Sequence, residues 1–191
     1  MYTKVSIPRH EDGGAPTIKN ATVILVDIND IASEPTRTLG NTEVVGNLTL
    51  ESGAKAVGVY ATPSTIIPTE EQSGEVDARG IIKGVEYVHP GNSVAIANHT
   101  EAFLNRPVVA IIRECDGASG KTLIIGSKCN PLYLQPEYTN SKEASNRKFV
   151  WKQDMPDKFV IGTYTGTIPD LAGEAAETSG SGSGSGSGEG D

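Results

Sequence analysis

The sequence is poor in cysteine, in aromatic residues and in long apolar runs, and each shortage excludes a class of protein. Two cysteines do not define a disulfide framework, which excludes a small disulfide-bonded secreted domain. No stretch approaches the roughly 18 apolar residues of a membrane span, and residues 1–10 lack the apolar run of a signal peptide. The sequence therefore predicts a protein made and folded in a cytosol, without membrane contact. We expect Cys115 and Cys129 to be reduced structural thiols, although both flank one hairpin and could also pair across it.

Positive charge is also scarce. Sixteen Lys and Arg residues face 24 Asp and Glu residues, which makes the formal net charge −8 and the isoelectric point about 4.9. A protein that holds nucleic acid tightly needs a basic surface to displace counterions from phosphate, so tight DNA or RNA binding is disfavoured. Part of the acidity lies in a final segment without Lys or Arg, at Asp170, Glu174, Glu177, Glu189 and Asp191.

A nucleotide-binding loop is missing despite one partial match. Residues 117–122 read GASGKT, but Cys115 stands where the pattern requires its first glycine, and a strand rather than a helix follows. Without a helix N-terminus a phosphate loses its amide donors. The segment therefore predicts a plain hairpin turn over residues 116–121.

No other catalytic or metal-binding pattern is present. The three histidines, His10, His89 and His99, fall on an arm, a turn and a helix, and none has ligand companions at metal-site spacing. Residues two apart on a helix point away from each other, so His99 and Glu101 share no face. There is no Gly-x-Ser-x-Gly elbow, and the pair Glu70-Glu71 lies in a polar loop. We expect no enzyme activity, no catalytic residue, no metal and no cofactor.

The chain divides into three parts by composition. Residues 1–19 mix Pro and Gly with charges and predict an extended N-terminal arm. Residues 20–168 are long enough for one β-domain with a sizeable core. Residues 169–191 form an acidic tail whose Ser-Gly repeat, residues 179–188, is typical of a flexible coil that buries nothing. Whether this repeat is native or engineered stays open.

The densest apolar sequence lies between residues 75 and 134, and we expect the rest of the fold to build on it. Its helix, residues 92–105, begins at a cap formed by Asn92 or Ser93 and ends before Pro107. The predicted order is a bent strand or strand pair at 75–88, the helix, a strand at 108–115, the turn, and a strand at 122–126.

Shorter strands are predicted on both sides of this centre. Two long polar loops, residues 29–42 and 62–74, separate them, and a third covers residues 135–146. Together the pattern indicates about nine short strands and one helix, typical of an antiparallel β-sandwich or barrel with one lateral helix. The expected strands are 21–28, 44–50, 56–61, 132–134, 147–153 and 158–167.

One strand could be mistaken for a base-stacking patch. Phe149 and Trp151 alternate with Arg147, Lys148 and Lys152. Alternation favours the simpler interpretation, in which the aromatic rings point into the sandwich and the basic side chains point out.

The order of these elements resembles the tail-tube subunits of long-tailed bacteriophages and their relatives in contractile injection machines. The resemblance covers residues 21–167. The segments that carry it are residues 77–80, 85–91, the helix 92–105, and residues 123–127 followed by 130–132. That family is held together by its fold more than by any diagnostic motif.

The resemblance implies a virion structural protein synthesised in the host cytoplasm. Subunits of that family form hexameric rings, and stacked rings conduct DNA through a lumen whose acidity repels phosphate. The expected partners are other copies of the chain, other tail or head–tail proteins, and DNA in transient, non-specific passage. Residues 29–42 and 62–74 would supply contacts between subunits, and residues 1–19 a docking arm.

Two other functions stay open from the sequence. A capsid decoration or head-fibre protein also suits a β-domain with a flexible tail. A monomeric carbohydrate-binding or adhesion module would need an exposed aromatic platform, for which the chain offers Trp151 and a few tyrosines. A ring subunit should melt in a concentration-dependent way, whereas a monomeric module should not.

Overall fold

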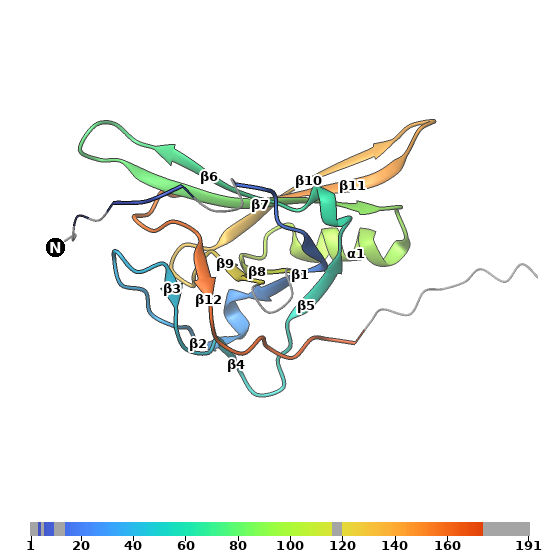
Figure 1. Ribbon diagram of the computed structural model, residues 1–191. Helices are drawn as coiled ribbons and strands as arrows, with labels where there is room; N and C mark the ends of the chain where they lie inside the picture. The colour runs from blue at the N-terminus through green and yellow to red at the C-terminus, as the bar shows by residue number, and fades with distance from the viewer. Residues whose placement is uncertain (1–3, 5, 10–13, 116–119, 174–191) are drawn as a thin grey trace, which may run out of the picture.

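The computed structural model describes residues 4, 6–9, 14–115 and 120–173, and within them the protein is mainly β with one α-helix (Figure 1). Before Lys19 the described residues form no helix or strand. Two short 3-10 turns, η1 (Ile28–Asp30) and η2 (Pro63–Thr65), and the helix α1 (Val94–Phe103) interrupt the strands. The strands are β1 (Lys19–Asp27), β2 (Ile31–Ser33), β3 (Glu43–Val44), β4 (Thr49–Leu50), β5 (Val57–Tyr60), β6 (Ile67–Ser73), β7 (Gly80–Pro90), β8 (Val108–Glu114), β9 (Thr122–Ile125), β10 (Leu132–Asn140), β11 (Ser145–Gln153) and β12 (Gly162–Tyr164).

Ten of these strands join in one large sheet, and β2 and β4 form a small separate one. The order is β3-β12-β9-β8-β10-β11-β7-β6, with β1 also paired to β8 and β5 to β1. Only Leu132 opposite Val108 connects β10 to β8, so the sheet consists of two halves. We call β5, β1, β8, β9, β12 and β3 the central sheet, and β10, β11, β7 and β6 the hairpin sheet. All pairs are antiparallel except β12 with β3, which makes the sheet mixed.

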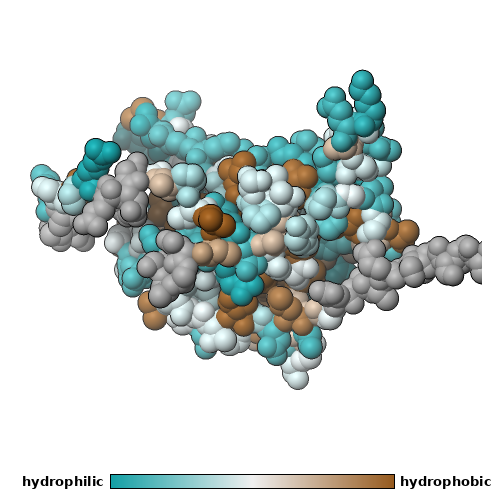
Figure 2. All heavy atoms as spheres, turned by 45° about the vertical axis from the view of Figure 1, so that its right-hand side comes forward, coloured by the Kyte–Doolittle hydropathy of each residue, from teal (hydrophilic) through white to brown (hydrophobic). Residues whose placement is uncertain are grey.

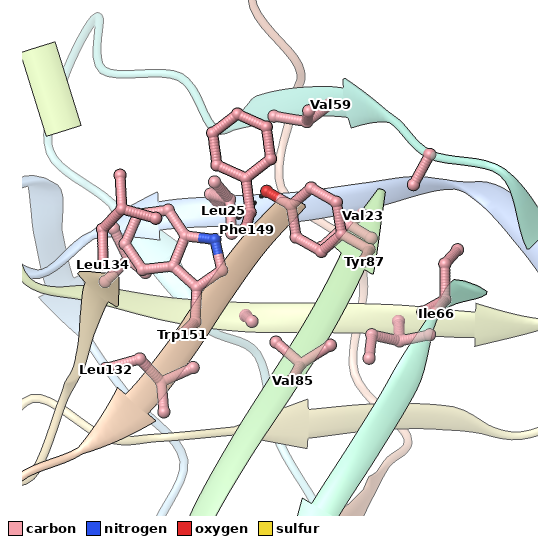
Figure 3. Close-up of a cluster of buried hydrophobic side chains, with 14 of the residues drawn as sticks. Val23, Leu25, Val59, Ile66, Val85, Tyr87, Leu132, Leu134, Phe149 and Trp151 are labelled. Atoms are coloured by element: carbon pink, nitrogen blue, oxygen red, sulfur yellow. Dashed lines mark hydrogen bonds between the residues drawn. The ribbon is translucent and has the colours of Figure 1, made fainter. Parts of the chain in front are cut away.

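The main hydrophobic core lies where the hairpin sheet packs against the central sheet (Figure 3). Side chains from β11 and β7 meet side chains from β1, and none of the following is more than 1 % exposed: Phe149, Trp151, Val85, Tyr87, Val23 and Leu25. Burying each large apolar side chain contributes about 1.5–3 kcal/mol. This confirms that Phe149 and Trp151 point inward.

A second core covers the opposite face of the central sheet. Ile24 and Val26 of β1 and Ile111 of β8 pack there against Val44 and Tyr164. Strands β1 and β8 are therefore buried on both faces, and such strands read as continuous apolar runs rather than as alternating ones. The predicted strands over residues 21–28 and 108–115 are confirmed for this reason.

Helix α1 begins where the sequence predicts. The Ser93 hydroxyl accepts a hydrogen bond from the backbone N–H of Ile96 at 3.4 Å, which satisfies one of the free donors of the first turn. Ile96, Thr100 and Phe103 form the buried side of the helix. The helix thus closes one end of the main core, as expected of a lateral helix.

Two of the predicted loops are strands. Residues 62–74 contain η2 and all of β6, and residues 135–146 contain most of β10 and the start of β11. Both segments are polar because they run beyond the core, where neither face of the strand is buried. Without an apolar face they lack the alternation by which a strand is recognised in a sequence. The loop prediction for both segments is therefore wrong.

Other boundaries also differ from the prediction. Residues 75–79 form the turn before β7, where Asp77 adopts a positive φ of 71°, so the apolar strand starts only at Gly80. The expected strand 158–167 shrinks to β12, and the expected strand 44–50 is divided between the last residue of β3 and the two residues of β4. The described residues hold twelve strands, more than the nine or so expected. The expected tail, residues 169–191, lies largely outside them, but Ala172 N donates to Ala56 O at 2.8 Å.

Candidate functional site

Two hairpins carry the hairpin sheet beyond the rest of the molecule and point in opposite directions (Figure 1). Asn146 of β11 lies opposite Pro90, at the C-terminal end of β7, so the β10–β11 turn projects from that end. Ser73 of β6 lies opposite Gly80, at the N-terminal end of β7, so the β6–β7 turn projects from the other end. The sheet thus has two projecting arms, the β6–β7 arm and the β10–β11 arm.

The face of the hairpin sheet that points away from the core carries ion pairs between neighbouring strands. Lys152 Nζ lies 2.6 Å from Glu71 Oε2, and Lys148 Nζ lies 2.8 Å from Glu86 Oε2. The hydrogen bond to Glu86 raises the pKa of Lys148. Glu137 lies opposite Lys148 on the same face. Three carboxylates therefore face two ammonium groups, and the upper edge of the molecule is mostly hydrophilic (Figure 2).

The two edges of the hairpin sheet are free over most of their length in the described part of the chain. Strand β6 pairs only with β7, and β10 pairs only with β11 and, at Leu132, with β8. A proline on each edge, Pro68 and Pro136, is tolerated where its missing N–H would point away from the ladder. The direction of the backbone N–H group alternates along a strand. Glu70 and Gln72 share the parity of Pro68, so their N–H groups point away from β7, as the missing N–H of Pro68 would. These two residues leave unpaired donors on the β6 edge.

An aromatic cluster fixes the hairpin sheet to the core. Trp151 Nε1 donates a hydrogen bond to Tyr87 Oη at 3.1 Å, and the Tyr87 and Phe149 rings stack at 5.3 Å between centroids (Figure 3). Burial raises the pKa of Tyr87. Phe149 and Trp151 are fully buried, so they cannot stack on nucleic-acid bases. Lys148 and Lys152 point outward as expected, whereas Arg147 lies on the core side and donates to Asn92 Oδ1 at 2.6 Å.

A cavity of about 290 Å³ opens between the loop 34–37, the end of β9 and the segment 157–159. We call it the Arg37 pocket. Its wall includes a buried ion pair, with Lys83 Nζ 2.7 Å from Asp157 Oδ2 and the side chains 6 % and 23 % exposed. Arg37 Nη1 donates to Val160 O, and the guanidinium stands 5.0 Å over the Phe159 ring. The arrangement is polar and nearly charge-balanced, with Arg37 as the group that has no carboxylate within ion-pair distance among the described residues.

A second hollow, about 550 Å³, lies between α1 and β5 and is lined by Tyr60, His89 and His99. His89 Nδ1 lies 2.9 Å from Tyr60 O. The centroids of the His99 and Phe103 rings lie 4.5 Å apart, and His99 Nε2 is buried without a hydrogen-bond partner among the described residues. Burial and the nearby His89 lower the pKa of His99 from 6.5 to about 4. The partly buried imidazole packs against the core residues Phe103 and Phe149.

This environment predicts acid sensitivity between about pH 6.5 and 4. The unfolded chain binds a proton at His99 near pH 6.5, whereas the folded chain binds it only near pH 4, so stability falls as the pH drops through this window. The loss should reach about 2–3 kcal/mol. Urea unfolding of His99→Leu at pH 7.5 and 4.5 should show a correspondingly smaller loss than the parent. His89→Gln removes only the charge of His89, the smaller cause of the pKa shift, and should keep most of the loss of stability at low pH. Equal losses in the parent and in His99→Leu would contradict the assignment to His99.

The remaining predicted residues do not form a site. His10 and residues 116–119 lie outside the described residues, but Glu114 N donates to Lys121 O, as a hairpin requires, and β9 follows instead of a helix. Both cysteines are free, as expected, so they do not pair across the hairpin, and both are exposed. In the described ranges, no three His, Cys, Asp or Glu side chains gather closely enough to hold a metal ion.

Sequence reasoning missed the Arg37 pocket, although part of its signal was present. Lys83 shares strand parity with Val85 and Tyr87, which are core residues, so its inward direction could have been recognised. The partner Asp157 gave no signal, because it belongs to a segment that bridges to Ile81 without forming a strand. Arg37 lies on a loop, where no periodicity indicates which way a side chain points.

No protein-family model, curated protein or solved structure matches the chain. Across residues 4–173, apart from the undescribed gaps, no helix has the length and apolarity needed to cross a membrane. Among the described residues, the hairpin sheet offers two strand edges that are free over most of their length.

Proposed function

We propose that the protein is a virion structural subunit that assembles head to tail into rings, as the tail-tube resemblance implies. The observation that carries the proposal is the hairpin sheet, in which four antiparallel strands end in free edges on β6 and β10. Unpaired edges are a liability in a monomer, and closing strands into a ring removes them.

The strand directions suit such closure. Neighbouring strands alternate in direction across β10, β11, β7 and β6, so the two edge strands run antiparallel to each other. A copy related by rotation about a ring axis would place its β10 beside β6 of the first copy, and this new pair would again be antiparallel. A head-to-tail interface of this kind closes into a ring when the rotation allows it.

The outward face of the hairpin sheet suits the wall of a hole. Both of its lysines are engaged with carboxylates, Lys152 with Glu71 and Lys148 with Glu86. Free ammonium groups would bind phosphate, whereas paired ones release fewer counterions and hold a duplex weakly. DNA could then slide past without being retained. The β6–β7 and β10–β11 arms, with the loop 34–42, would supply contacts between stacked rings.

Blocking one edge donor should abolish assembly. Gln72→Pro removes an N–H that points away from β7, and it therefore spares the β6–β7 ladder while deleting a hydrogen bond to the next copy. We expect rings or tubes from the unmodified protein in negative-stain micrographs at high concentration. We expect Gln72→Pro to stay monomeric by light scattering, with an unchanged circular dichroism spectrum.

Gln72→Ala is the matched control, because it keeps the backbone donor, and it should assemble normally. If Gln72→Pro formed the same particles, the β6 edge would not be the interface. An unmodified protein that is monomeric at every concentration would overturn the ring proposal altogether, and a capsid decoration protein or a monomeric binding module would replace it.

A further inference from the structure

We infer that the Arg37 pocket is a binding site for a carboxylate group. The pocket combines a partly open volume with a guanidinium that is held in place and incompletely paired. Arg37 Nη1 is anchored to Val160 O and the guanidinium lies over Phe159, whereas Arg37 Nε is buried and has no hydrogen-bond partner. An unpaired buried donor is costly, and a ligand that accepts from it removes the cost.

The energetics of Arg37 favour a negatively charged occupant. Burial lowers the pKa of Arg37, and the negative charges of Asp157 and Glu70 oppose this shift without outweighing it. An arginine stays protonated in proteins, so its desolvation is a loss that a nearby counter-charge offsets. A carboxylate supplies the charge and two acceptor oxygens in the planar geometry that a guanidinium matches.

The other charged groups of the pocket already have partners. Asp157 accepts from Lys83 Nζ at 2.7 Å and from Phe159 N at 2.6 Å. Glu34 Oε2 accepts from Lys128 N at 2.8 Å. The two acids are therefore occupied, and Arg37 is the charge left to bind a ligand. A volume of about 290 Å³ admits a short dicarboxylic acid or one acidic side chain, with Val44 and Ile124 forming part of an apolar wall.

Two sources of the carboxylate are consistent with this chemistry: a free small molecule, or an acidic side chain of a second copy. The second source rests on the proposed ring. The pocket lies close to the free edge, because Glu70 of β6 accepts a hydrogen bond from Ile161 N and its charge acts on Arg37. A copy that pairs with β6 would therefore approach the pocket.

The first experiment titrates succinate into the dilute, monomeric full chain while arginine Nε–H resonances are followed by nitrogen-15 NMR at constant ionic strength. We expect one resonance to shift and saturate, and Arg37→Gln to remove that resonance and weaken binding about tenfold or more. Arg79→Gln, on the exposed β6–β7 turn, is the matched control and should bind like the parent. Thermal melts of both variants check that they fold.

The second experiment raises the protein concentration without succinate and follows the same resonance alongside the mass in solution. A shift that accompanies assembly, and that succinate reverses, identifies a second copy as the source. A shift with succinate alone identifies a free carboxylate, and it does so even if the protein never assembles. No shift of the Arg37 resonance in either experiment overturns the carboxylate site, whether or not rings form.

Discussion

Replacing Trp151 with alanine should destabilise the protein by about 3–5 kcal/mol, which would leave much of a typical domain unfolded. Trp151 is fully buried between the two sheets, with the Phe103 ring edge-on at 6.1 Å. Its removal opens a cavity and deprives the buried Tyr87 hydroxyl of the donor at 3.1 Å. Trp151 is the only tryptophan, so unfolding in urea must be followed by far-ultraviolet circular dichroism rather than by fluorescence.

Two controls separate packing from hydrogen bonding at this position. Trp151→Phe keeps an aromatic ring but loses the hydrogen bond to Tyr87, and it should cost less than alanine. Lys152→Ala, the next residue on the same strand, points outward and should change stability by no more than about 1 kcal/mol. Equal losses for Trp151→Ala and Lys152→Ala would mean that the aromatic cluster does not hold the hairpin sheet in place.

The parts of the fold that the sequence predicts well are those in which burial leaves a clear pattern. Strands β1 and β8 are buried on both faces and read as unbroken apolar runs. Helix α1 has both an apolar side and a Ser93 cap. Strand β11 alternates aromatic and basic residues, with the aromatic ones inside. The apolar runs locate β1 and β8, whereas the apolar side of α1 and the alternation in β11 also indicate which side of each element faces the core.

The projecting arms could not be predicted in this way. Strands β6 and the outer part of β10 are stabilised by pairing with β7 and β11 rather than by burial of their own side chains. Such pairing depends on segments distant in the sequence, and polar residues with prolines are typical of loops as well as of edge strands. The surface that supports the proposed assembly is therefore the one that local sequence patterns describe least.

The Arg37 pocket was hidden for a different reason. Its walls come from the loop 34–37, from strands β3, β7 and β9 and from the segment 157–159, which no local pattern connects. Only Lys83 could have been identified, as a lysine on the inner face of an otherwise apolar strand. A buried lysine predicts an acidic partner somewhere in the fold, but the sequence does not say which of 24 acidic residues it is.

The Lys83–Asp157 pair should be the most sensitive polar contact in the molecule. Lys83→Met keeps the aliphatic stem but leaves Asp157 without its cation inside the structure, and we expect a loss of about 2–4 kcal/mol in urea unfolding at pH 7. This expected loss of stability is slightly smaller than the loss on breaking a fully buried ion pair, because the Asp157 side chain is 23 % exposed. The same change removes the side-chain attachment of Asp157 to β7 and leaves the backbone bridge between Asp157 and Ile81 in place.

A double variant decides whether the unpaired charge causes this loss. Lys83→Met combined with Asp157→Asn removes both charges while keeping an acceptor for Phe159 N, and it should recover at least half of the stability. Lys148→Met breaks a Lys–Glu pair on the outward face of the same sheet and should leave the unfolding midpoint nearly unchanged, because water solvates Glu86 there. If the double variant were as unstable as Lys83→Met, the unpaired charge on Asp157 would not be the cause of the loss. The segment 157–161 would then be held by its backbone bridge to Ile81 rather than by charge.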